Sequence, residues 1–198
     1  MSFHVTLSFK KGKIIKQTKH NIMALSCKLS QNILRGNNCG YSLPEIVDIY
    51  LANFEDVTGF GLAEETCGES VSAITMSAGT NWYHIEPAKN SASFEDALVV
   101  NDNGGKYRTH TLTFSVNGQY TACMHQNLDD LALGKYVAVI KTAEGSYLML
   151  GRITGLEAET ATLSGGGDTN GLQIVLSANV TESAIPVTGG AIDTVVGE

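Results

Sequence analysis

The stretch that decides the fold reads Tyr136-Val-Ala-Val-Ile-Lys141, Ala143-Glu-Gly-Ser146, Tyr147-Leu-Met-Leu-Gly-Arg152. Two runs of apolar and β-branched residues flank a short polar segment with Gly145, which predicts two strands joined by a tight turn. Around this hairpin, residues 107–180 alternate further strand patterns with one short amphipathic pattern. No group of residues among them is suited to chemistry, so the region is typical of an assembly component and not of an enzyme.

Length and composition limit the class of protein. The chain has 198 residues, of which 43% are apolar and 17% charged, and this is enough apolar material for the core of one domain. Gly is frequent, with 21 residues, and Pro is rare, with 3. This balance favours an all-β or β-rich protein with many turns over a helical bundle or a disordered chain.

The charge is distributed unevenly along the chain. Residues 1–22 contain five lysines and no acidic residue, although the whole chain has a net charge of −7. Outside this basic leader, 8 basic and 20 acidic residues give a net charge of −12. An acidic body is unsuited to gripping nucleic acid, because affinity for phosphate comes largely from Lys and Arg.

The basic leader has more than one interpretation. It is an interaction tail or a solvated surface arm, neither of which needs a fold, or it is not native and the protein begins at Met23-Ala24. Its apolar run Ile14-Ile15 is too short for a secretion signal. No later segment reaches the roughly 18 apolar residues of a membrane helix. We therefore expect a soluble protein made in the cytosol.

The four cysteines are scattered, at Cys27, Cys39, Cys67 and Cys123, without a C-x-x-C pair or a histidine at ligand spacing. This spacing favours reduced, structural thiols. The alternative is a bridge between Cys27 and Cys39 in an oxidising exterior.

Strand patterns recur along the chain. In residues 45–52, Val47, Ile49 and Leu51 alternate with Ile46, Asp48 and Tyr50 and predict one fully apolar face. Residues 53–70 are polar and Gly-rich and predict a long loop or loose hairpin, whereas residues 77–80 predict a hairpin turn. The remaining predicted strands are residues 71–76, 82–86, 91–100, 107–116, 156–164 and 172–180, with strong turn signals at residues 101–105 and 165–171.

One segment has helical spacing. Between Gly118 and Leu133 the apolar residues recur at helical intervals, with Asn117 as the expected N-cap and Gly134 as the stop. This is the only helix that the sequence predicts convincingly. Residues 186–198 are expected to be a flexible or partner-dependent tail.

Candidate chemistry is weak throughout. The Gly-rich residues 165–171 lack the Lys-Ser/Thr of a phosphate-binding loop, and no G-x-S-x-G nucleophile elbow occurs. His84 and His110 have no evident third metal ligand. The sequence therefore predicts no catalytic residues, no metal site, no cofactor and no enzyme. The adjacent pair Trp82-Tyr83 is suited to stacking on a sugar, although such a pair more often belongs to a core or an interface.

The order of these elements resembles the tail tube proteins of long-tailed bacteriophages. The resemblance covers residues 27–186 and rests on the hairpin quoted above, on Gly155-Leu-Glu157 and on Asp168-Thr-Asn-Gly171-Leu-Gln-Ile-Val-Leu176. The Cys-containing lead-in to the first strand, from Cys39 to Leu51, is similar to tube proteins of phages that infect Bacteroidetes-type hosts. The basic leader departs from this pattern.

The resemblance implies a mainly β, sandwich-like or barrel-like tail tube fold with one flanking helix. It also implies rings, usually hexamers, that stack into a hollow conduit, as in contractile-tail inner tubes and the haemolysin-coregulated protein of type VI secretion. The expected parts are an N-terminal arm (1–44), a tube domain (45–185) and a C-terminal tail (186–198). Partners would be other copies of the chain, tape measure and terminator proteins, and DNA that passes without specific binding.

Particular residues follow from this expectation. Glu86, Glu157 and Glu159 are candidates for lumen charge, because strand alternation puts the last two on one face, while salt bridges between subunits are an equal alternative. Candidates for loop contacts between subunits are Phe54, Phe60, Phe94 and Asp96. The protein is expected in the virion tail, away from membranes. Rival functions are a tail terminator, a capsid decoration protein and a carbohydrate-binding β-sandwich module.

Overall fold

The computed structural model describes residues 32–33, 43, 45–65, 68–118, 121–166 and 170–197. The chain divides into residues Met1–Gly40 and a compact unit, Tyr41–Glu198, which contains every helix and strand found in the described residues. The basic leader, and the N-terminal arm apart from residues 32–33 and 43, lie outside the described residues. Three of the four cysteines do so as well, while Cys123 is an exposed free thiol.

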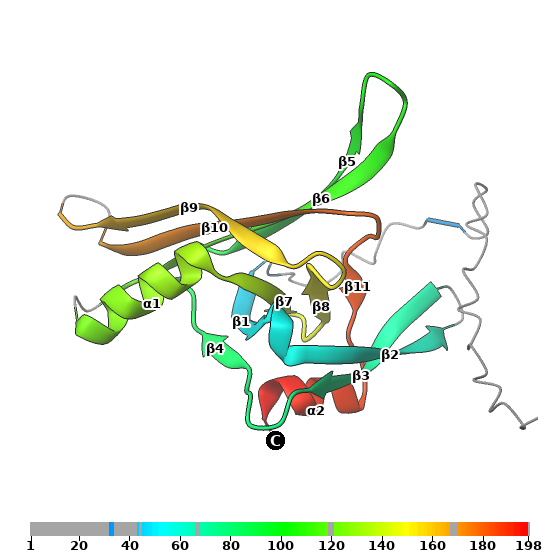
Figure 1. The fold of residues 1–198 in the computed structure, drawn as a ribbon, viewed down its shortest axis with the longest axis horizontal. Helices are drawn as coiled ribbons and strands as arrows, with labels where there is room; N and C mark the ends of the chain where they lie inside the picture. Colours follow the sequence, from blue (N-terminus) through cyan, green and yellow to red (C-terminus); the bar gives the residue numbers. More distant parts are fainter. Residues whose placement is uncertain are drawn as a thin grey trace, which may run out of the picture. The chain divides into compact units, whose positions relative to one another are not determined.

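The protein is mainly β, as predicted (Figure 1). Seven strands of a nine-stranded sheet follow the order β11-β8-β7-β9-β10-β6-β5. The other two are β1, which pairs with β7, and β4, which pairs with β1. Its strands are β1 (Ile46–Asn53), β4 (Tyr83–Ile85), β5 (Ser93–Val100), β6 (Lys106–Val116), β7 (Lys135–Thr142), β8 (Tyr147–Leu150), β9 (Leu156–Ser164), β10 (Gly171–Val180) and β11 (Ile185–Pro186). A separate hairpin consists of β2 (Val57–Glu65) and β3 (Gly68–Met76) after a short 3-10 helix, Phe54–Asp56.

Strand β7 is at the centre of the fold and is buried on both faces. Alternate residues of β7 contribute to two hydrophobic clusters, Tyr136, Ala138 and Ile140 to the first core and Val137 and Val139 to the second. This double burial explains why the quoted stretch is almost continuously apolar. It also confirms the predicted hairpin, since β7 pairs with β8 around Gly145.

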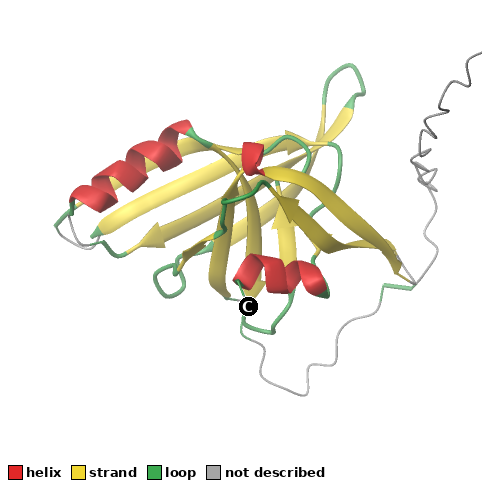
Figure 2. Ribbon diagram, turned by 60° about the horizontal axis from the view of Figure 1, so that its bottom comes forward, coloured by secondary structure: helices red, strands yellow, loops and turns green. Residues whose placement is uncertain are grey.

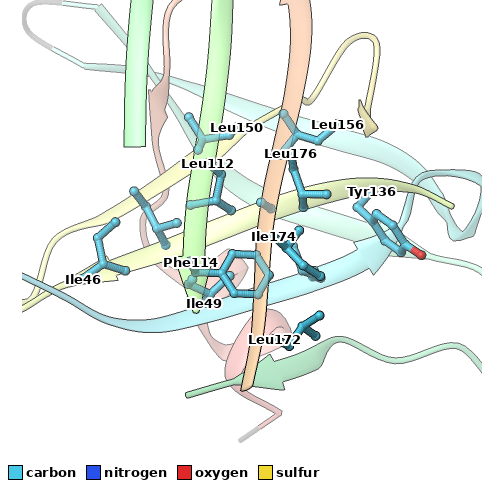
Figure 3. Close-up of a cluster of buried hydrophobic side chains, with 13 residues drawn as sticks. Ile46, Ile49, Leu112, Phe114, Tyr136, Leu150, Leu156, Leu172, Ile174 and Leu176 are labelled. Carbon is cyan, nitrogen blue, oxygen red and sulfur yellow. The ribbon is translucent and has the colours of Figure 1, made fainter. Parts of the chain in front are cut away.

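The first core lies between strands β6 and β10 on one side and strands β1 and β7 on the other (Figure 3). Leu112 and Phe114 of β6 and Ile174 and Leu176 of β10 are fully buried in it, against β1 and β7. Burying such side chains stabilises the fold by about 1.5–3 kcal/mol each. The arrangement is sandwich-like, in agreement with the predicted fold class.

The second core covers the opposite face of β1, β7 and β8. Val71 and Ile74 of the β2–β3 hairpin meet Val187 and helix α2 (Gly190–Val196) there. The C-terminal segment therefore differs from the flexible tail that the sequence predicts, because Ala191 and Val195 are buried. In the described residues, α2 is thus a second α-helix beside the sheets in addition to the single predicted one (Figure 2).

Helix α1 (Ala122–Leu133) confirms the predicted helix, with one change at its start. The hydroxyl of Thr121 accepts a hydrogen bond from the backbone N–H of Met124 and caps the helix, so the prediction of Asn117 as the cap was wrong. Gly134 ends the helix as predicted. Met124, Leu128 and Leu131 pack against the first core.

Two local predictions concern the segments around β2 and β3. Of the two alternatives for residues 53–70, a long loop or a loose hairpin, the hairpin is confirmed: residues 57–65 form strand β2, which pairs with β3 with two register shifts. Residues 77–80 do not close a hairpin, because β3 pairs with β2 whereas β4 pairs with β1. Turn composition alone does not specify which strands pair.

The predicted apolar face of β1 is interrupted. The register against β7 shifts between Ile46 and Asp48, so Ile46 joins Ile49 and Leu51 in the first core while Val47 is exposed. An extra residue of this kind is a β-bulge, which inverts the alternation beyond it.

Candidate functional site

The four strands β9, β10, β6 and β5 present one polar face turned away from the first core. Their ladders are antiparallel, and residues directly opposite each other share a face, as Thr111 does with Glu95 and Ser177. This polar face contains Ser93, Glu95, Ala97, Val99, Tyr107, Thr109, Thr111, Thr113, Ser115, Glu157, Glu159, Thr160, Thr162, Gln173, Val175, Ser177 and Asn179.

All charged residues of the polar face are acidic. They are Glu95, Glu157 and Glu159, and all three are exposed. Glu159 lies where the register between β9 and β10 shifts, between Ala158 and Thr160. At the border of the face, the Nζ of Lys135 lies 2.8 Å from an oxygen of Glu157 and offsets its charge.

The polar face brings together two of the three predicted lumen residues, Glu157 and Glu159. Glu86 lies elsewhere, beside a cleft next to α1. Sequence analysis missed Glu95, although Ser93 and Glu95 continue the polar alternation that is visible in residues 107–116. The pairing of β5 with β6, which no local pattern specifies, puts Glu95 on this face.

Both edges of this four-stranded region are unpaired within the described part of the chain. Strand β5 pairs only with β6, and β9 pairs with β7 only at Leu156 and Glu157, so residues 158–164 have a partner on one side alone. Unpaired edges of this length are sites for pairing with another chain.

Strand β5 also carries exposed apolar side chains on the face opposite to Glu95. Phe94, Leu98 and Val100 are 37%, 58% and 56% exposed. In Figure 1 the hairpin of β5 and β6 extends past the other strands, which leaves this apolar stripe (Phe94, Leu98, Val100) uncovered. Phe94, a predicted contact residue, therefore lies on an edge strand and not in a loop.

Asp96 lies on β5 between Phe94 and Leu98, on the same face as the stripe, and it is bound inside the chain. Its carboxylate accepts hydrogen bonds from Nε of Arg108 at 2.6 Å and from the backbone N–H of Ala184 at 3.0 Å. Burial opposes ionisation of Asp96, but these hydrogen bonds and the positive charge of Arg108 outweigh it and hold its pKa below the ordinary value. Asp96 therefore anchors the hairpin and is not a loop residue.

His110 is buried beside this carboxylate. Its Nδ1 accepts a hydrogen bond from the backbone N–H of Gly151 at 3.3 Å, and its Nε2 lies 3.5 Å from Asp96, without a hydrogen-bond partner in the described residues. Burial lowers the pKa of His110, and the charges of Asp96 and Glu182 offset this only in part. Glu182 is itself bound by Arg152.

The other two predicted contact residues, Phe54 and Phe60, pack within the chain. Both lie against the second core. The ammonium of Lys135 is 5.6 Å from the ring centre of Phe54, and the guanidinium of Arg152 is 5.7 Å from that of Phe60. These cation–π contacts stabilise the packing of the 3-10 helix and of β2.

A cleft of about 800 Å³ lies between α1 and the strands β1 and β4. Trp82 and Tyr83 line it together with polar groups that include Asn127 and Asp130. The indole Nε1 of Trp82 is buried without a hydrogen-bond partner in the described residues, and its ring packs on the second core. Tyr83 is 57% exposed.

Next to this cleft, His84 is held between two neighbours. Its ring stacks on Tyr50 with centroids 4.9 Å apart, and its Nε2 lies 2.9 Å from Asp48. Burial opposes ionisation of Asp48, but hydrogen bonds from His84 and Lys141 outweigh it and lower the pKa of this carboxyl. His84 and His110 are separate, as each has its own carboxylate.

Among the residues that the structure describes, no three His, Cys, Asp or Glu side chains are grouped as metal ligands. No helix in these ranges has the length and apolarity needed to cross a membrane. No protein-family model, curated protein or solved structure matches the chain.

Proposed function

We propose that this chain is a bacteriophage tail tube subunit, which polymerises into stacked rings around a conduit for DNA. The observation that carries the proposal is the four-stranded region β9-β10-β6-β5. Its outer strands, β5 and most of β9, each have one edge without a partner in the described residues, and the charges of its polar face are all acidic. These features support the family resemblance of the sequence and do not depend on it.

The even number of strands in this region favours a closed ring. The four strands alternate in direction, so β5 and β9 run in opposite senses. Rotation of one copy about an axis parallel to the strands therefore places its β5 antiparallel to β9 of the next copy. Such a head-to-tail contact uses two different surfaces, and it generates a ring when the rotation closes.

The chemistry of the polar face is suited to the lining of a DNA conduit. Hydroxyl and amide side chains keep such a surface hydrated, and Glu95, Glu157 and Glu159 repel phosphates. The four strands contribute no Lys or Arg to this face, and Lys135 at its border is paired with Glu157, so the face offers few sites at which DNA can displace its counterions. DNA then passes through without being held.

The proposal includes a location and partners. The subunit is made in the host cytoplasm and becomes part of the virion tail, where it contacts other copies, a tape measure protein and a terminator protein. The proposed function is assembly, and it involves no catalytic step, cofactor or membrane contact.

Electron microscopy of the purified protein tests the assembly. We expect stacked rings or open-ended tubes with a central bore. Single closed rings would favour a terminator or a decoration protein, and monomers at all concentrations would contradict the proposal.

Labelling tests which face lines the bore. In a variant whose four native cysteines are serine, Thr162→Cys places a thiol on the polar face and Ser146→Cys places one on the exposed turn between β7 and β8. In tubes, we expect a small maleimide to label both thiols and a long polyethylene-glycol maleimide to label only residue 146. Equal labelling by the large reagent would contradict the assignment of the bore.

A second candidate function, carbohydrate binding, is favoured by the cleft that Trp82 and Tyr83 line with amide and carboxylate groups. Tyr83→Ala is the cleaner test, because Trp82 also packs on the second core. Binding on a glycan array that this variant loses would favour carbohydrate recognition. Absence of glycan binding by the native protein would exclude it.

A further inference from the structure

A continuous groove runs between helix α1 and strand β4. The cleft of about 800 Å³ adjoins a second hollow of about 460 Å³, and the two share His84, Ile85, Asn127 and Leu131 in their linings. Apolar side chains form much of the wall of this α1–β4 groove, among them Leu133, which is 88% exposed. An open apolar hollow of this size is typical of a binding surface.

The tip of the β5–β6 hairpin, residues 98–106, extends past the neighbouring strand. Strand β10 opposes β6 only as far as Arg108, so the residues nearer the turn pair only within the hairpin. Leu98 and Val100 of the apolar stripe lie at and beyond this level and are 58% and 56% exposed. Lys106, directly opposite Val100, is also exposed and points to the same face.

The groove and the hairpin tip lie on the same side of the sheet. Lys106, Phe114 and Val116 are separated by even numbers of residues along β6, so their side chains point to one face. Phe114 and Val116 line the groove. Leu98 and Val100 share the face of Lys106 through the ladder between β5 and β6. The polar face is on the other side.

The groove and the hairpin tip lie at opposite ends of the strands. Lys106 is the first residue of β6 and Val116 the last, and a strand of this length separates them by about 33 Å. Figure 1 shows the β5–β6 hairpin and α1 at opposite ends of the sheet. A copy displaced along the strand direction therefore presents its tip to the groove of the next copy. Because the two surfaces differ, such a contact repeats and builds an open stack.

Lateral contacts within a ring leave the tip uncovered. A row of opposed residues crosses the four strands from Glu157 of β9 to Glu95 of β5. The tip lies beyond this row on one side, whereas residues 158–164 of β9 lie beyond it on the other. Strand β9 of a neighbour at the same level therefore does not cover Leu98 or Val100. A copy in the next ring can do so.

The charges of the two surfaces are complementary. Two carboxylates line the groove, Glu86 at the end near Val116 and Asp130 further along α1, and no Lys or Arg lines it within the described residues. On the stripe face of the tip the charged residue is Lys106, while Asp102 lies in the turn itself. Neither Glu86 nor Lys106 has an ion-pair partner in the part of the chain that the structure describes.

We propose that the hairpin tip of one copy binds in the α1–β4 groove of a copy in the next ring, with Leu98 and Val100 on the apolar wall and Lys106 beside Glu86. The proposal rests on the proposed tube function and names the contact that stacks the rings. Burial of exposed apolar side chains drives the association, and the opposite charges fix its orientation. The groove then holds a segment of a second copy and not a sugar.

Disulfide trapping tests the contact directly. Val100→Cys and Asn127→Cys are introduced together into a variant whose four native cysteines are serine. The two sites are near opposite ends of one copy, so a bond between them joins two copies. Oxidised tubes are expected to give a ladder of covalent oligomers on a non-reducing gel, whereas Val100→Cys alone gives at most dimers.

The matched control moves the second thiol to the other side of the same helix. Residues 125 and 127 are about 200° apart around α1, and only Asn127 lines the groove. Val100→Cys with His125→Cys should therefore give no ladder beyond dimers. Tubes without a ladder from the Asn127→Cys pair overturn the contact and leave the tube proposal standing. Wild-type protein that forms no tubes in electron microscopy overturns both.

Charge substitution gives a second test. Lys106→Glu or Glu86→Lys alone is expected to raise the concentration at which rings stack at least about tenfold, because the repulsion recurs at every contact around a ring. The two substitutions together should restore stacking. Glu69→Lys, at an exposed site that belongs to neither surface, should leave it unchanged. Thermal unfolding of the unassembled chain should be the same in all variants. Tubes that form equally well from every variant would overturn the contact.

The single tryptophan reports whether the groove is filled. Trp82 is the only Trp of the chain, and it lines the groove. Acrylamide should quench its emission less in wild-type tubes than in single rings of Lys106→Glu, because the docked tip shields the groove. Equal quenching would show that the groove stays open in the tube. That result would overturn the proposal and leave the groove free for a ligand such as a sugar.

Discussion

His110 and Gly151, 41 residues apart, are joined by a hydrogen bond from the backbone N–H of Gly151 to Nδ1 of the imidazole. Because Nδ1 is an acceptor, the ring is neutral and its proton is on Nε2, which faces Asp96. The bond links strand β6 of the projecting hairpin to the turn after β8. Protonation of Nδ1 would turn the acceptor into a donor and break this link.

The first prediction concerns pH. The pKa of His110 is lowered in the folded protein, so the unfolded chain binds a proton first as the pH falls. The stabilisation is complete above the unfolded pKa of about 6.5 and is lost as the pH falls below it toward the folded value. We expect the free energy of unfolding in urea to decrease between about pH 6.5 and pH 5, above the range in which carboxyls such as Asp96 titrate.

Paired variants isolate this titration. His110→Gln should flatten the dependence in that range, although the protein becomes less stable overall, because Asp96, Arg108 and Glu182 no longer surround a titrating ring. His125→Gln, whose histidine side chain is 75% exposed, should keep the wild-type slope. The same slope in His110→Gln as in the wild type would contradict the assignment.

The second prediction compares two glycines with similar backbone angles. Gly151 and Gly145 have φ values of +71° and +84°, in the region where an L side chain is strained. A Cβ on Gly151 would lie 2.7 Å from Cγ of Leu156, whereas one on Gly145 would meet nothing within 4 Å. Gly145→Ala should cost about 1 kcal/mol in urea unfolding and Gly151→Ala about 2–4 kcal/mol. Equal costs would show that Leu156 moves away freely.

Much of the fold was predictable, because strands such as β6 and β7 and helix α1 have clear periodicity in the sequence. Helix α2 was not, since its seven residues include a starting glycine and β-branched side chains with low helix propensity. Burial of Ala191 and Val195, one turn apart, overrides that propensity. The polar face could be predicted only in part, because Glu95 joins it through the long-range pairing of β5 with β6.

The third prediction tests the bulge in β1, which sequence alternation did not show. Val47 and Ile49 are two residues apart and would share a face in a regular strand, but Val47 is 44% exposed and Ile49 is fully buried. Ile49→Ala should cost about 2–5 kcal/mol of unfolding free energy. Val47→Ala should stay within about 0.5 kcal/mol. Comparable losses in urea denaturation at the two sites would argue against the register shift.

The fourth prediction concerns the anchor of the projecting hairpin. Asp96→Asn keeps the shape of the side chain but removes the charge that binds Arg108, whose side chain is about one third exposed. We expect a loss of about 1–3 kcal/mol, in the range for hydrogen bonds to charged groups. Asp102→Asn, in the exposed turn of the same hairpin, should change stability by less than about 0.5 kcal/mol. Hydrogen exchange at β5 should accelerate in the first variant only.

The fifth prediction tests the electrostatics of the conduit. If Glu95 and Glu159 line the bore, the double substitution Glu95→Lys and Glu159→Lys makes it basic, and assembled tubes should then retain short duplex DNA at low salt and release it as the salt concentration rises. The matched control, Glu55→Lys with Glu69→Lys, changes the net charge equally at exposed sites off the polar face. Nuclease digestion distinguishes the two, because DNA inside a bore is protected whereas DNA on the outer surface is cut. If the DNA is digested in both variants, the polar face lies on the outside of the tube. Its acidic residues could then not repel DNA inside the bore, because charges repel DNA only from the wall that the DNA meets.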